Sequence, residues 1–428
     1  MKKITLFFII ILFINGLFGV KTPSSLPFAN SYLQRSSGAE SLYWNPALIS
    51  NVNTSGEWMS MPYVIEIENN MISVDLYNRF FRGRHFNYEE ITAIKNEILD
   101  AIGDRFNMKV NLKIILVGMS FGNYAYSTST NVLFKSSLHS DFIELAFVSN
   151  DEFRIYDFGD DHNDFILLGY QDFTFGYGGY NVNQLFPENM DFMPNITVGA
   201  GLSYLRGIYT DRLSEFDGVF RTSNEDGVVL YQSVKRISGE RGNGIKASLG
   251  ISVDAFQFDE NHYITTGMSL DNIGASIRWT YALNEHENTV RIDSLHVNKL
   301  DKDIYTESNG KTELKAFTTK LPLNLKIGAL YKFNELSASI DYAQNFGSGV
   351  AISFSPEISF GIEYILGDYF PIQIGHRLPI DDIEMANSIG LGLRLNRYEF
   401  GAAYQSIGSF HSYSNTGFAI GSYMKFRF

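Results

Sequence analysis

One stretch in the second half of the chain decides the fold class: Leu321-Pro-Leu-Asn-Leu-Lys-Ile-Gly-Ala-Leu-Tyr-Lys-Phe333. Its odd-numbered positions are all apolar, and its even-numbered positions include Asn324, Lys326, Gly328 and Lys332. Successive side chains of a β-strand point to opposite faces, so this stretch has one apolar and one polar face. The same period of two continues in the stretches 336–343, 351–366, 370–377, 388–396, 397–406 and 416–428.

The length of these stretches distinguishes a secreted β-sandwich from a transmembrane β-barrel. A secreted β-sandwich also alternates, with its apolar face turned inward. Soluble strands are typically about 5 or 6 residues long, whereas residues 321–333 alternate throughout, which is long enough to cross a bilayer at a tilt. The stretches also end in the aromatic residues that membrane girdles require, among them Tyr331, Phe333, Tyr364, Phe370 and Tyr398. We therefore expect an all-β chain that forms a transmembrane antiparallel β-barrel.

The number of strand-like stretches predicts the size of the barrel. Bacterial barrels have even strand numbers, and the stretches found along the whole chain predict about fourteen strands, with sixteen possible. Glu57–Ile67 and Met71–Tyr77 are expected to form the opening hairpin. The polar stretches 211–227 and 284–318 are expected to be extracellular loops, because the periplasmic turns of such barrels are short.

One stretch, residues 88–106, departs from the strand pattern. Its apolar residues include Ile94, Ile98 and Ile102, which are spaced as on one face of a helix. Asn87 is a plausible N-cap for this helix. Two interpretations stay open: a loop helix that packs on the barrel rim, or an element that covers the lumen.

The composition excludes several classes of protein. The 428 residues include no Cys and 15% aromatic residues, and the formal net charge is -13. This aromatic content is too high for a disordered chain, and a chain without Cys is no disulfide-stapled scaffold. An acidic chain repels phosphate, which argues against a nucleic-acid partner. The mean hydropathy of -0.08 looks like that of a soluble protein, because alternating apolar and polar faces average out.

The first twenty residues have the layout of a secretory signal peptide. Lys2 and Lys3 precede an apolar run, residues 6–14, and Gly19 offers a small residue for cleavage. The run is shorter than the roughly 20 residues that a helix needs to span a bilayer. We expect residues 1–19 to be a signal peptide; the alternative is an N-terminal membrane anchor.

A short motif follows in residues 36–48, which read Ser-Ser-Gly-Ala-Glu-Ser-Leu-Tyr-Trp-Asn-Pro-Ala-Leu. This segment, with Trp44, Asn45, Pro46 and Ala47, resembles the start of the long-chain fatty-acid transporter superfamily and of its relatives, the PorV/PorQ-type barrels. In those families the segment folds back as a plug. Asn-Pro also favours a turn by itself, and a rigid turn suits an anchored plug.

The resemblance implies a domain organisation and a function. Residues 20–55 would be the plug segment, and residues 56–428 an outer-membrane β-barrel of a Gram-negative-type cell. The barrel would pass or take up hydrophobic small molecules. One alternative is a non-transporting PorV-like barrel that binds secreted proteins or a secretion machine; another is a purely structural barrel. Asp271-Asn-Ile-Gly274 also resembles a turn of PorV-like proteins.

The end of the chain carries a second resemblance. Phe426 and Phe428 share one face of the last strand-like stretch, and Phe428 is the final residue. A closing strand that ends in Phe resembles the C-terminal signal that the outer-membrane barrel assembly machinery binds. We therefore expect this machinery and outer-membrane lipid among the partners.

Charged residues on the polar faces are expected to face the barrel lumen. Mixed signs inside a barrel most often pair with each other and with a plug, although a charge-selective channel would use the same residue types. The predicted lumen charges are Lys326, Asp341, Glu363, Arg377, Arg394 and Glu399, together with Lys246, Asp254, Arg278 and Lys332.

A search for catalytic and metal-binding motifs finds little. Asp157-Phe-Gly159 matches a kinase tripeptide, but no phosphate-binding loop accompanies it. The acidic stretch 157–164 lacks the spacing of a calcium loop, and the eight His residues lack the spacing of zinc ligands. We therefore predict no enzyme, no metal and no cofactor.

Overall fold

The computed structural model covers most of the chain. It describes residues 22–52, 54–80, 88–147, 154–159, 163–185, 194–223, 227–295, 305–350, 353–381, 383–409 and 413–428. The expected signal peptide, residues 1–19, and the expected N-cap Asn87 lie outside the described residues, so both stay predictions.

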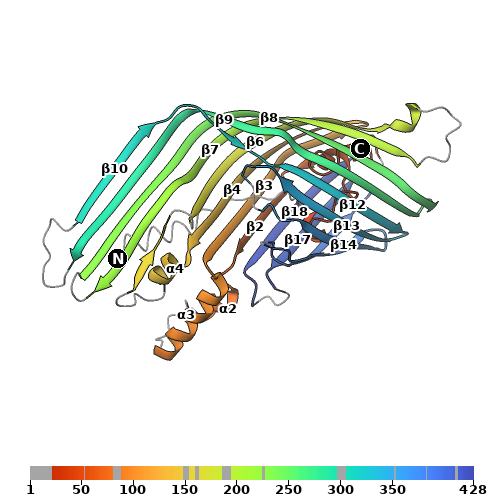
Figure 1. Cartoon of the computed structure of the whole chain (residues 1–428). Coiled ribbons are helices and arrows are strands. Elements are labelled where there is room, and N and C mark those ends of the chain that lie inside the picture. Colours follow the sequence, from red (N-terminus) through yellow and green to blue (C-terminus); the bar gives the residue numbers. More distant parts are fainter. Residues whose placement is uncertain are drawn as a thin grey trace.

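The described strands form one antiparallel sheet that closes into a barrel (Figure 1). The last strand pairs with the first two, so the two ends of the sheet meet. The strands are β1 Gly56–Ser60, β2 Tyr63–Asn69, β3 Arg105–Phe121, β4 Tyr124–His139, β5 Ile155–Asp157, β6 Asp164–Asn181, β7 Ile196–Ser223, β8 Gly227–Asp259, β9 His262–Leu295, β10 Tyr305–Glu313, β11 Phe317–Lys320, β12 Leu323–Phe333, β13 Leu336–Phe346, β14 Glu357–Leu366, β15 Phe370–Arg377, β16 Ala386–Arg394, β17 Tyr398–Ile407 and β18 Gly417–Arg427.

The eighteen described strands occupy fourteen positions around the ring. β1 and β2 both pair with β3 and β18, so they follow each other in one position. β5 and β6 both pair with β7, and β10, β11 and β12 all pair with β9. The expected all-β fold, a transmembrane antiparallel barrel of about fourteen strands, is confirmed.

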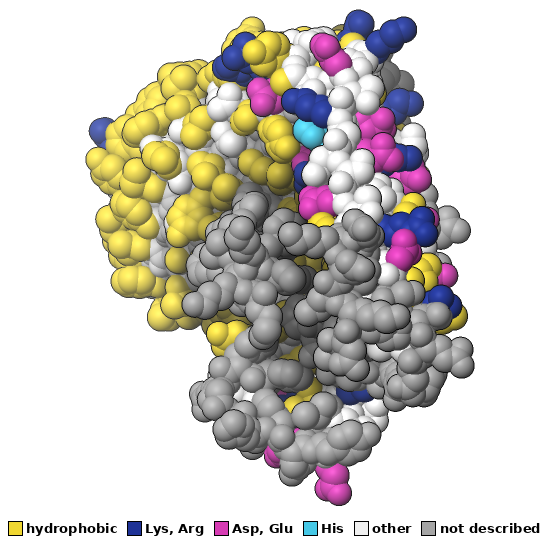
Figure 2. All heavy atoms as spheres, turned by 90° about the vertical axis from the view of Figure 1, so that its left-hand side faces the viewer, with side chains coloured by type: hydrophobic (Ala, Val, Ile, Leu, Met, Phe, Trp, Pro, Cys, Tyr) yellow, Lys and Arg dark blue, Asp and Glu magenta, His cyan; other side chains and the backbone are white. Residues whose placement is uncertain are grey.

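The outer wall has the apolar face that the alternation predicts. On β12, Ile327, Tyr331 and Phe333 are exposed, whereas Asn324 and Lys326 are buried on the inner face. Figure 2 shows hydrophobic side chains gathered over one part of the visible face, beside a part covered by charged and polar side chains. Apolar side chains can face lipid because the ring of strands satisfies the backbone hydrogen bonds.

The two ends of the barrel differ. At one end, turns of two residues join β3 to β4, β8 to β9 and β12 to β13. At the other end most connections are longer, and they include three α-helices: α2, Val74–Phe80; α3, Tyr88–Ile102; and α4, Ser140–Phe147. The first end has one longer connection, residues 182–195 between β6 and β7. β7, β8, β9 and β10 extend well beyond the barrel at this second end (Figure 1).

The prediction that residues 211–227 and 284–318 form loops is wrong. Their described parts lie mostly in β7, β8, β9, β10 and β11, which pair as long hairpins. Outside a bilayer no lipid requires one face of a sheet to be apolar throughout, so its strands need no regular alternation of apolar and polar residues. Without that period, these polar strands look like loops in the sequence.

The prediction of a strand at Met71–Tyr77 is also wrong, because α2 begins there. The Ser73 hydroxyl accepts a hydrogen bond from the backbone N–H of Leu76 at 3.0 Å, which caps the first turn. Leu76 is then buried against Ile94 and Ile98. Capping and helix packing therefore overrode the short apolar alternation.

The helix expected near residues 88–106 is α3. It packs with α2 and α4 in an apolar cluster, and Lys95 forms an ion pair with Glu144 at 2.7 Å. The buried residues of this cluster are Met71, Leu76, Ile94, Ile98, Ile102 and Ile143. This packing agrees with the first of the two interpretations, a loop helix at the rim. None of the described helices is both long and apolar enough to cross a membrane.

Candidate functional site

The N-terminal segment, residues 22–52, lies inside the barrel. Every residue from Thr22 to Ile49 is buried, except Arg35 and Ser37, which are half-buried. The segment contains three short 3-10 helices: η1, Leu26–Phe28; η2, Gly38–Tyr43; and η3, Pro46–Leu48. Folded this way, it fills the middle of the lumen and contacts strands on many sides.

The motif residues Trp44, Asn45, Pro46 and Ala47 lie where this segment meets β8 and β9. The Asn45 side chain accepts a hydrogen bond from the N–H of Ala47 at 3.1 Å and donates one to the Ile251 carbonyl at 3.0 Å. The Trp44 carbonyl accepts a hydrogen bond from Ser269 at 2.6 Å, and its indole donates to Thr22 at 3.0 Å. The expected Asn-Pro turn thus begins η3, with Asn45 as its N-cap.

Glycines on the inner face of the wall allow this close approach. A Cβ on Gly178 or Gly199 would lie 1.8 Å or 2.3 Å from the Pro46 carbonyl oxygen, and one on Gly250 would lie 2.1 Å from Asn45 Oδ1. A second group faces η1, where Gly361, Gly375 and Gly390 contact Pro27 and Phe28. The sequence alone places these glycines on the polar faces of the strands, but only the structure shows that they contact the N-terminal segment.

Two of the predicted lumen charges bind the backbone of the N-terminal segment. The Lys326 ammonium donates to the Tyr43 carbonyl at 3.1 Å. The Asp341 carboxylate accepts hydrogen bonds from the backbone N–H groups of Tyr32 and Leu33, both at 2.6 Å. Both charged side chains therefore hold the segment rather than line an open channel.

Four further predicted lumen charges, Glu363, Arg377, Arg394 and Glu399, pair with charges on other strands. Arg394 lies 3.0 Å from Glu363 and 3.6 Å from Glu399. Arg377 is buried and lies 3.7 Å from Glu357. Glu66 and Glu68 of β2 also lie close to Arg377, at 3.9 Å and 3.8 Å. Mixed signs inside the barrel therefore compensate each other, as charges in a low-dielectric site must.

Of the remaining predicted lumen charges, Arg278 does not fit. Lys246 is buried and lies 3.4 Å from Asp271, whereas Asp254 and Lys332 are half-buried. Arg278 is exposed on the outer wall, because its neighbours Ile277 and Trp279 are fully buried on the inner face. On this part of β9 the apolar face is the inner one. The rule that apolar residues face lipid therefore places Arg278 in the lumen, which is the wrong side.

Two contacts of the N-terminal segment, an ion pair and a cation–π contact, were not predicted from the sequence. Lys425 of β18 forms a buried ion pair with Glu40 at 2.6 Å. The Lys113 ammonium lies 3.5 Å from the centre of the Tyr43 ring, in a cation–π contact. The alternation of Lys425 with apolar residues was a usable signal, but nothing in the sequence links it to Glu40.

The hydroxyl groups of the two tyrosines in the segment, Tyr32 and Tyr43, stay protonated and neutral. The Tyr43 hydroxyl lies 2.6 Å from Ser127, and the Tyr32 hydroxyl donates to Glu40 at 3.1 Å. Burial raises the pKa of both hydroxyls well above the ordinary tyrosine value. Both side chains therefore act as packing and hydrogen-bonding groups.

Two cavities lie on opposite sides of the N-terminal segment. One, of about 190 Å³, lies toward the end with long connections; its lining includes Asn30 and Trp44 of the segment, Leu168 and Leu321 of the surrounding barrel, and charged barrel residues such as Arg377. The other, also about 190 Å³, lies toward the end with short turns, and Glu363 is among its lining residues. The segment thus separates two compartments of the lumen.

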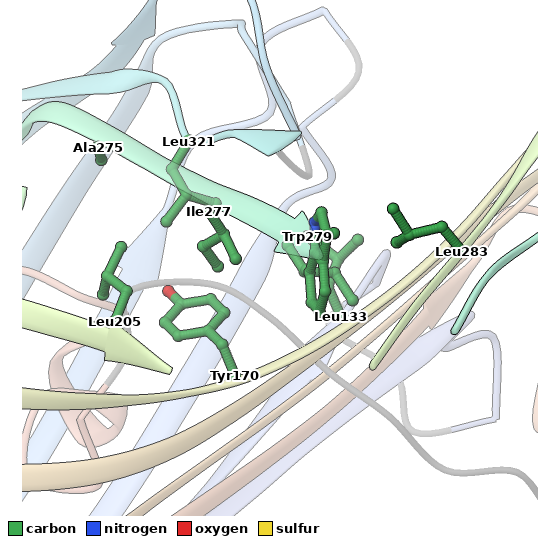
Figure 3. Close-up of a cluster of buried hydrophobic side chains, with 9 residues drawn as sticks. Leu133, Tyr170, Leu205, Ala275, Ile277, Trp279, Leu283 and Leu321 are labelled. Atoms are coloured by element: carbon green, nitrogen blue, oxygen red, sulfur yellow. The ribbon is translucent and has the colours of Figure 1, made fainter. Parts of the chain in front are cut away.

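The first cavity adjoins an apolar cluster that was not predicted. Figure 3 shows these side chains gathered inside the barrel, from strands β4, β6, β7 and β9. The Trp279 indole is fully buried and donates a hydrogen bond to Thr319 at 2.9 Å. The buried members are Leu133, Leu168, Tyr170, Leu205, Ala275, Ile277, Trp279, Leu283 and Leu321. We call this set the lumen apolar cluster.

The proposed assembly signal lies at the seam of the barrel. The Phe428 backbone exchanges two hydrogen bonds with Gly56, both at 3.1 Å. The ring of Phe426 lies 5.1 Å from that of Tyr398, and the ring of Phe428 lies 5.3 Å from that of Phe121. The two phenylalanines thus help to close the ring, while their role in assembly stays a prediction.

The acidic stretch 157–164 lies only partly within the described residues, since residues 160–162 are outside them. Asp157 accepts a hydrogen bond from the N–H of Gly159. Among the described residues, no group of three or more His, Asp or Glu side chains is arranged to hold a metal ion.

Two crystal structures are similar to this chain. The toluene transporter TbuX of Ralstonia pickettii gives a TM-score of 0.52 at 13% identity, covering 97% of this chain and 100% of that one. A FadL homologue of Pseudomonas aeruginosa gives 0.52 at 12% identity, with the same shares of each chain. At such identities the likeness shows a common fold, so the expectation of a barrel of the outer-membrane type is confirmed at that level.

Sequence comparison adds the family. A search of curated proteins finds no match. The sequence model of a family of unknown function, DUF5723, matches residues 46–401, which is most of the chain. The chain therefore belongs to the family of unknown function DUF5723.

Proposed function

We propose that the chain is an outer-membrane barrel through which hydrophobic small molecules pass. The lumen apolar cluster carries this proposal. The interior of a membrane barrel is ordinarily polar, yet Ile277 and Trp279 are fully buried on the inner face, in a cluster whose members Leu168 and Leu321 line a cavity. The apolar part of this lining suits a hydrophobic ligand; the cavity is also lined by charged side chains, among them Glu66 and Arg377.

The two ends of the barrel suggest a direction of passage. The long connections of such barrels face the outside and the short turns face the periplasm. The cavity beside the lumen apolar cluster then lies on the outer side, and the cavity with Glu363 lies on the periplasmic side. A ligand would enter at the apolar side and leave after the N-terminal segment moves or by a sideways exit.

The N-terminal segment fits the part of a plug in this proposal. We propose that residues 1–19 are a signal peptide, residues 20–55 a plug and residues 56–428 the barrel. Trp44, Asn45, Pro46 and Ala47 would anchor the plug against the inner glycines. The description of TbuX as a toluene transporter supports a hydrophobic substrate, and a PorV-like role gains no such support.

The test is uptake of labelled oleate into liposomes that contain the purified protein. Wild type is expected to accelerate uptake over protein-free liposomes. Ile277→Asn places an amide in the lumen apolar cluster and is expected to reduce uptake several-fold. Ile143→Asn is the matched control, because Ile143 is equally buried but lies among the rim helices.

Two results would count against the proposal: equal uptake by wild type and Ile277→Asn, or uptake that a deletion of residues 22–50 leaves unchanged. Heat-dependent gel mobility confirms that each variant is a folded barrel. A pull-down that recovers secreted proteins, with no oleate uptake, would favour the PorV-like alternative instead.

A further inference from the structure

Four cationic side chains are exposed on the outer wall of neighbouring strands. They are Arg206 of β7, Arg241 of β8, Arg278 of β9 and Lys320 of β11. In contrast, none of the charged side chains described on β13–β18 is exposed. The described strands β13–β18 thus carry no exposed charge, whereas the other strands carry these four cations and further exposed charges of both signs, such as Arg236 and Glu287.

The strand register places these side chains close together. Arg206 pairs with Asn243, Asn243 with Arg278, and Arg278 with Thr318. Adjacent strands are about 4.8 Å apart, so the Cα atoms of Arg206 and Arg278 lie roughly 10 Å apart on one face. Arg241 and Lys320 lie two positions along their strands from Asn243 and Thr318, on that same face. We call these four residues the cationic patch.

The four side chains of the patch have little negative charge beside them in the sequence. Among the described residues, no salt bridge includes any of its four members; the Arg241 guanidinium lies 4.4 Å from the centre of the Tyr281 ring instead. Glu240, which is also exposed, is the one acidic residue within two positions of them in the sequence. Four cations with one nearby acid form a site for an anion.

The patch lies where the lipid-facing surface ends. On β7 the exposed residues Leu202 and Tyr204 precede Arg206, and on β8 the exposed Ile245 lies two positions from Asn243. The Tyr204 hydroxyl donates a hydrogen bond to Asn243. Tyrosine and arginine at the end of an apolar belt mark the level of lipid headgroups. The patch also lies toward the end with long connections, which is the outer side in the proposed orientation.

We propose that the cationic patch binds the phosphate groups of an anionic glycolipid in the outer leaflet of the outer membrane. Guanidinium groups form paired hydrogen bonds with phosphate oxygens, and residues on adjacent strands can bind two phosphates of one headgroup. Cations that merely reach toward water would be spread around the ring, whereas these occupy adjacent strands. The proposal depends on the orientation but not on transport through the lumen.

The test measures binding of lipopolysaccharide to the purified full-length protein in neutral detergent. Wild type is expected to bind it more tightly than its dephosphorylated form, and binding is expected to weaken with salt. The double substitution R206Q/R278Q removes two guanidinium groups and their charges, and it is expected to weaken binding about tenfold or more. R206K/R278K keeps the charge and is expected to retain much of the affinity.

The matched control is R397Q/K311Q, which removes two exposed cations outside the patch and is expected to bind as wild type does. Wild-type affinity in R206Q/R278Q, or equal affinity for dephosphorylated lipid, would overturn the proposal. Complete competition by millimolar inorganic phosphate would also overturn it, since the site would then take a free anion. Oleate uptake by folded R206Q/R278Q separates this result from the proposed transport.

Discussion

A single buried ion pair joins the N-terminal segment to the closing strand. Glu40 and Lys425 are both almost fully buried, and their charged atoms lie 2.6 Å apart. Removing one partner of such a pair leaves a buried charge without compensation. A substitution of either residue should therefore weaken the binding of the N-terminal segment to the barrel.

Glu40→Gln is expected to destabilise the folded barrel by about 3 to 5 kcal/mol, the usual cost of breaking a buried pair. It should also raise ion conductance in planar bilayers, because the segment that fills the lumen loses a partner. Replacing both residues, in E40Q/K425M, should restore much of the stability, since no unpaired charge remains. Conductance and heat-dependent gel mobility equal to wild type in E40Q would contradict this account.

The inner glycines support a second prediction at this scale. In Gly199→Ala the new Cβ would overlap the Pro46 carbonyl, so either the wall or the turn must shift. Overpacking of this kind costs about 1 to 3 kcal/mol, and the displaced turn should raise conductance. Gly310→Ala is the control, because a Cβ there meets only ordinary contacts, at 3.4 Å or more. Equal conductance in the two variants would show that the turn at Pro46 does not seal the lumen.

At the scale of elements, the rim helices form a core separate from the lumen apolar cluster. Ile98 of α3 is buried against α2 and α4, and its cluster shares no member with the lumen apolar cluster. Ile98→Asp places a charge in this small core and is expected to unfold the helices while the barrel persists. Protease cleavage near α3 together with unchanged heat-dependent gel mobility would verify this. Loss of the folded barrel band would show that the helices support the wall.

The elements also show where sequence patterns succeed. Alternation located β12 and its successors well, because one face meets lipid and the other a polar lumen. It failed for the strands beyond the barrel, where no lipid imposes the alternation, and for β9 near Trp279, where the inner face is apolar. The helical period correctly placed α3, while α2 was hidden in a short apolar run.

At the scale of the molecule, the fold depends on joining the two ends of the chain. The pairing of β18 with β1 and β2, and of Phe428 with Gly56, closes the ring. An open edge in the membrane would leave backbone groups without hydrogen bonds, which costs several kcal/mol for each group. Closure is therefore required for insertion as well as for shape.

Deleting Phe426–Phe428 is expected to stop closure and leave the chain unassembled. Pulse-chase labelling should then show loss of the heat-modifiable barrel form and faster degradation. Phe428→Tyr keeps the ring and the backbone pairing, so it should assemble almost as wild type does. If the variant that lacks these residues assembled normally, they would be needed neither for the final strand pairing nor as an assembly signal.

The sequence by itself determined that the chain is a membrane barrel of about fourteen strands, because lipid outside and polar groups inside impose a period of two on every spanning strand. It also marked Trp44, Asn45, Pro46 and Ala47 as a turn. The tertiary structure alone decided which inner glycines contact that turn, which charges pair across the lumen, and that Arg278 lies outside while Trp279 lies inside. These depend on the register between strands far apart in the chain, and no local pattern contains that information.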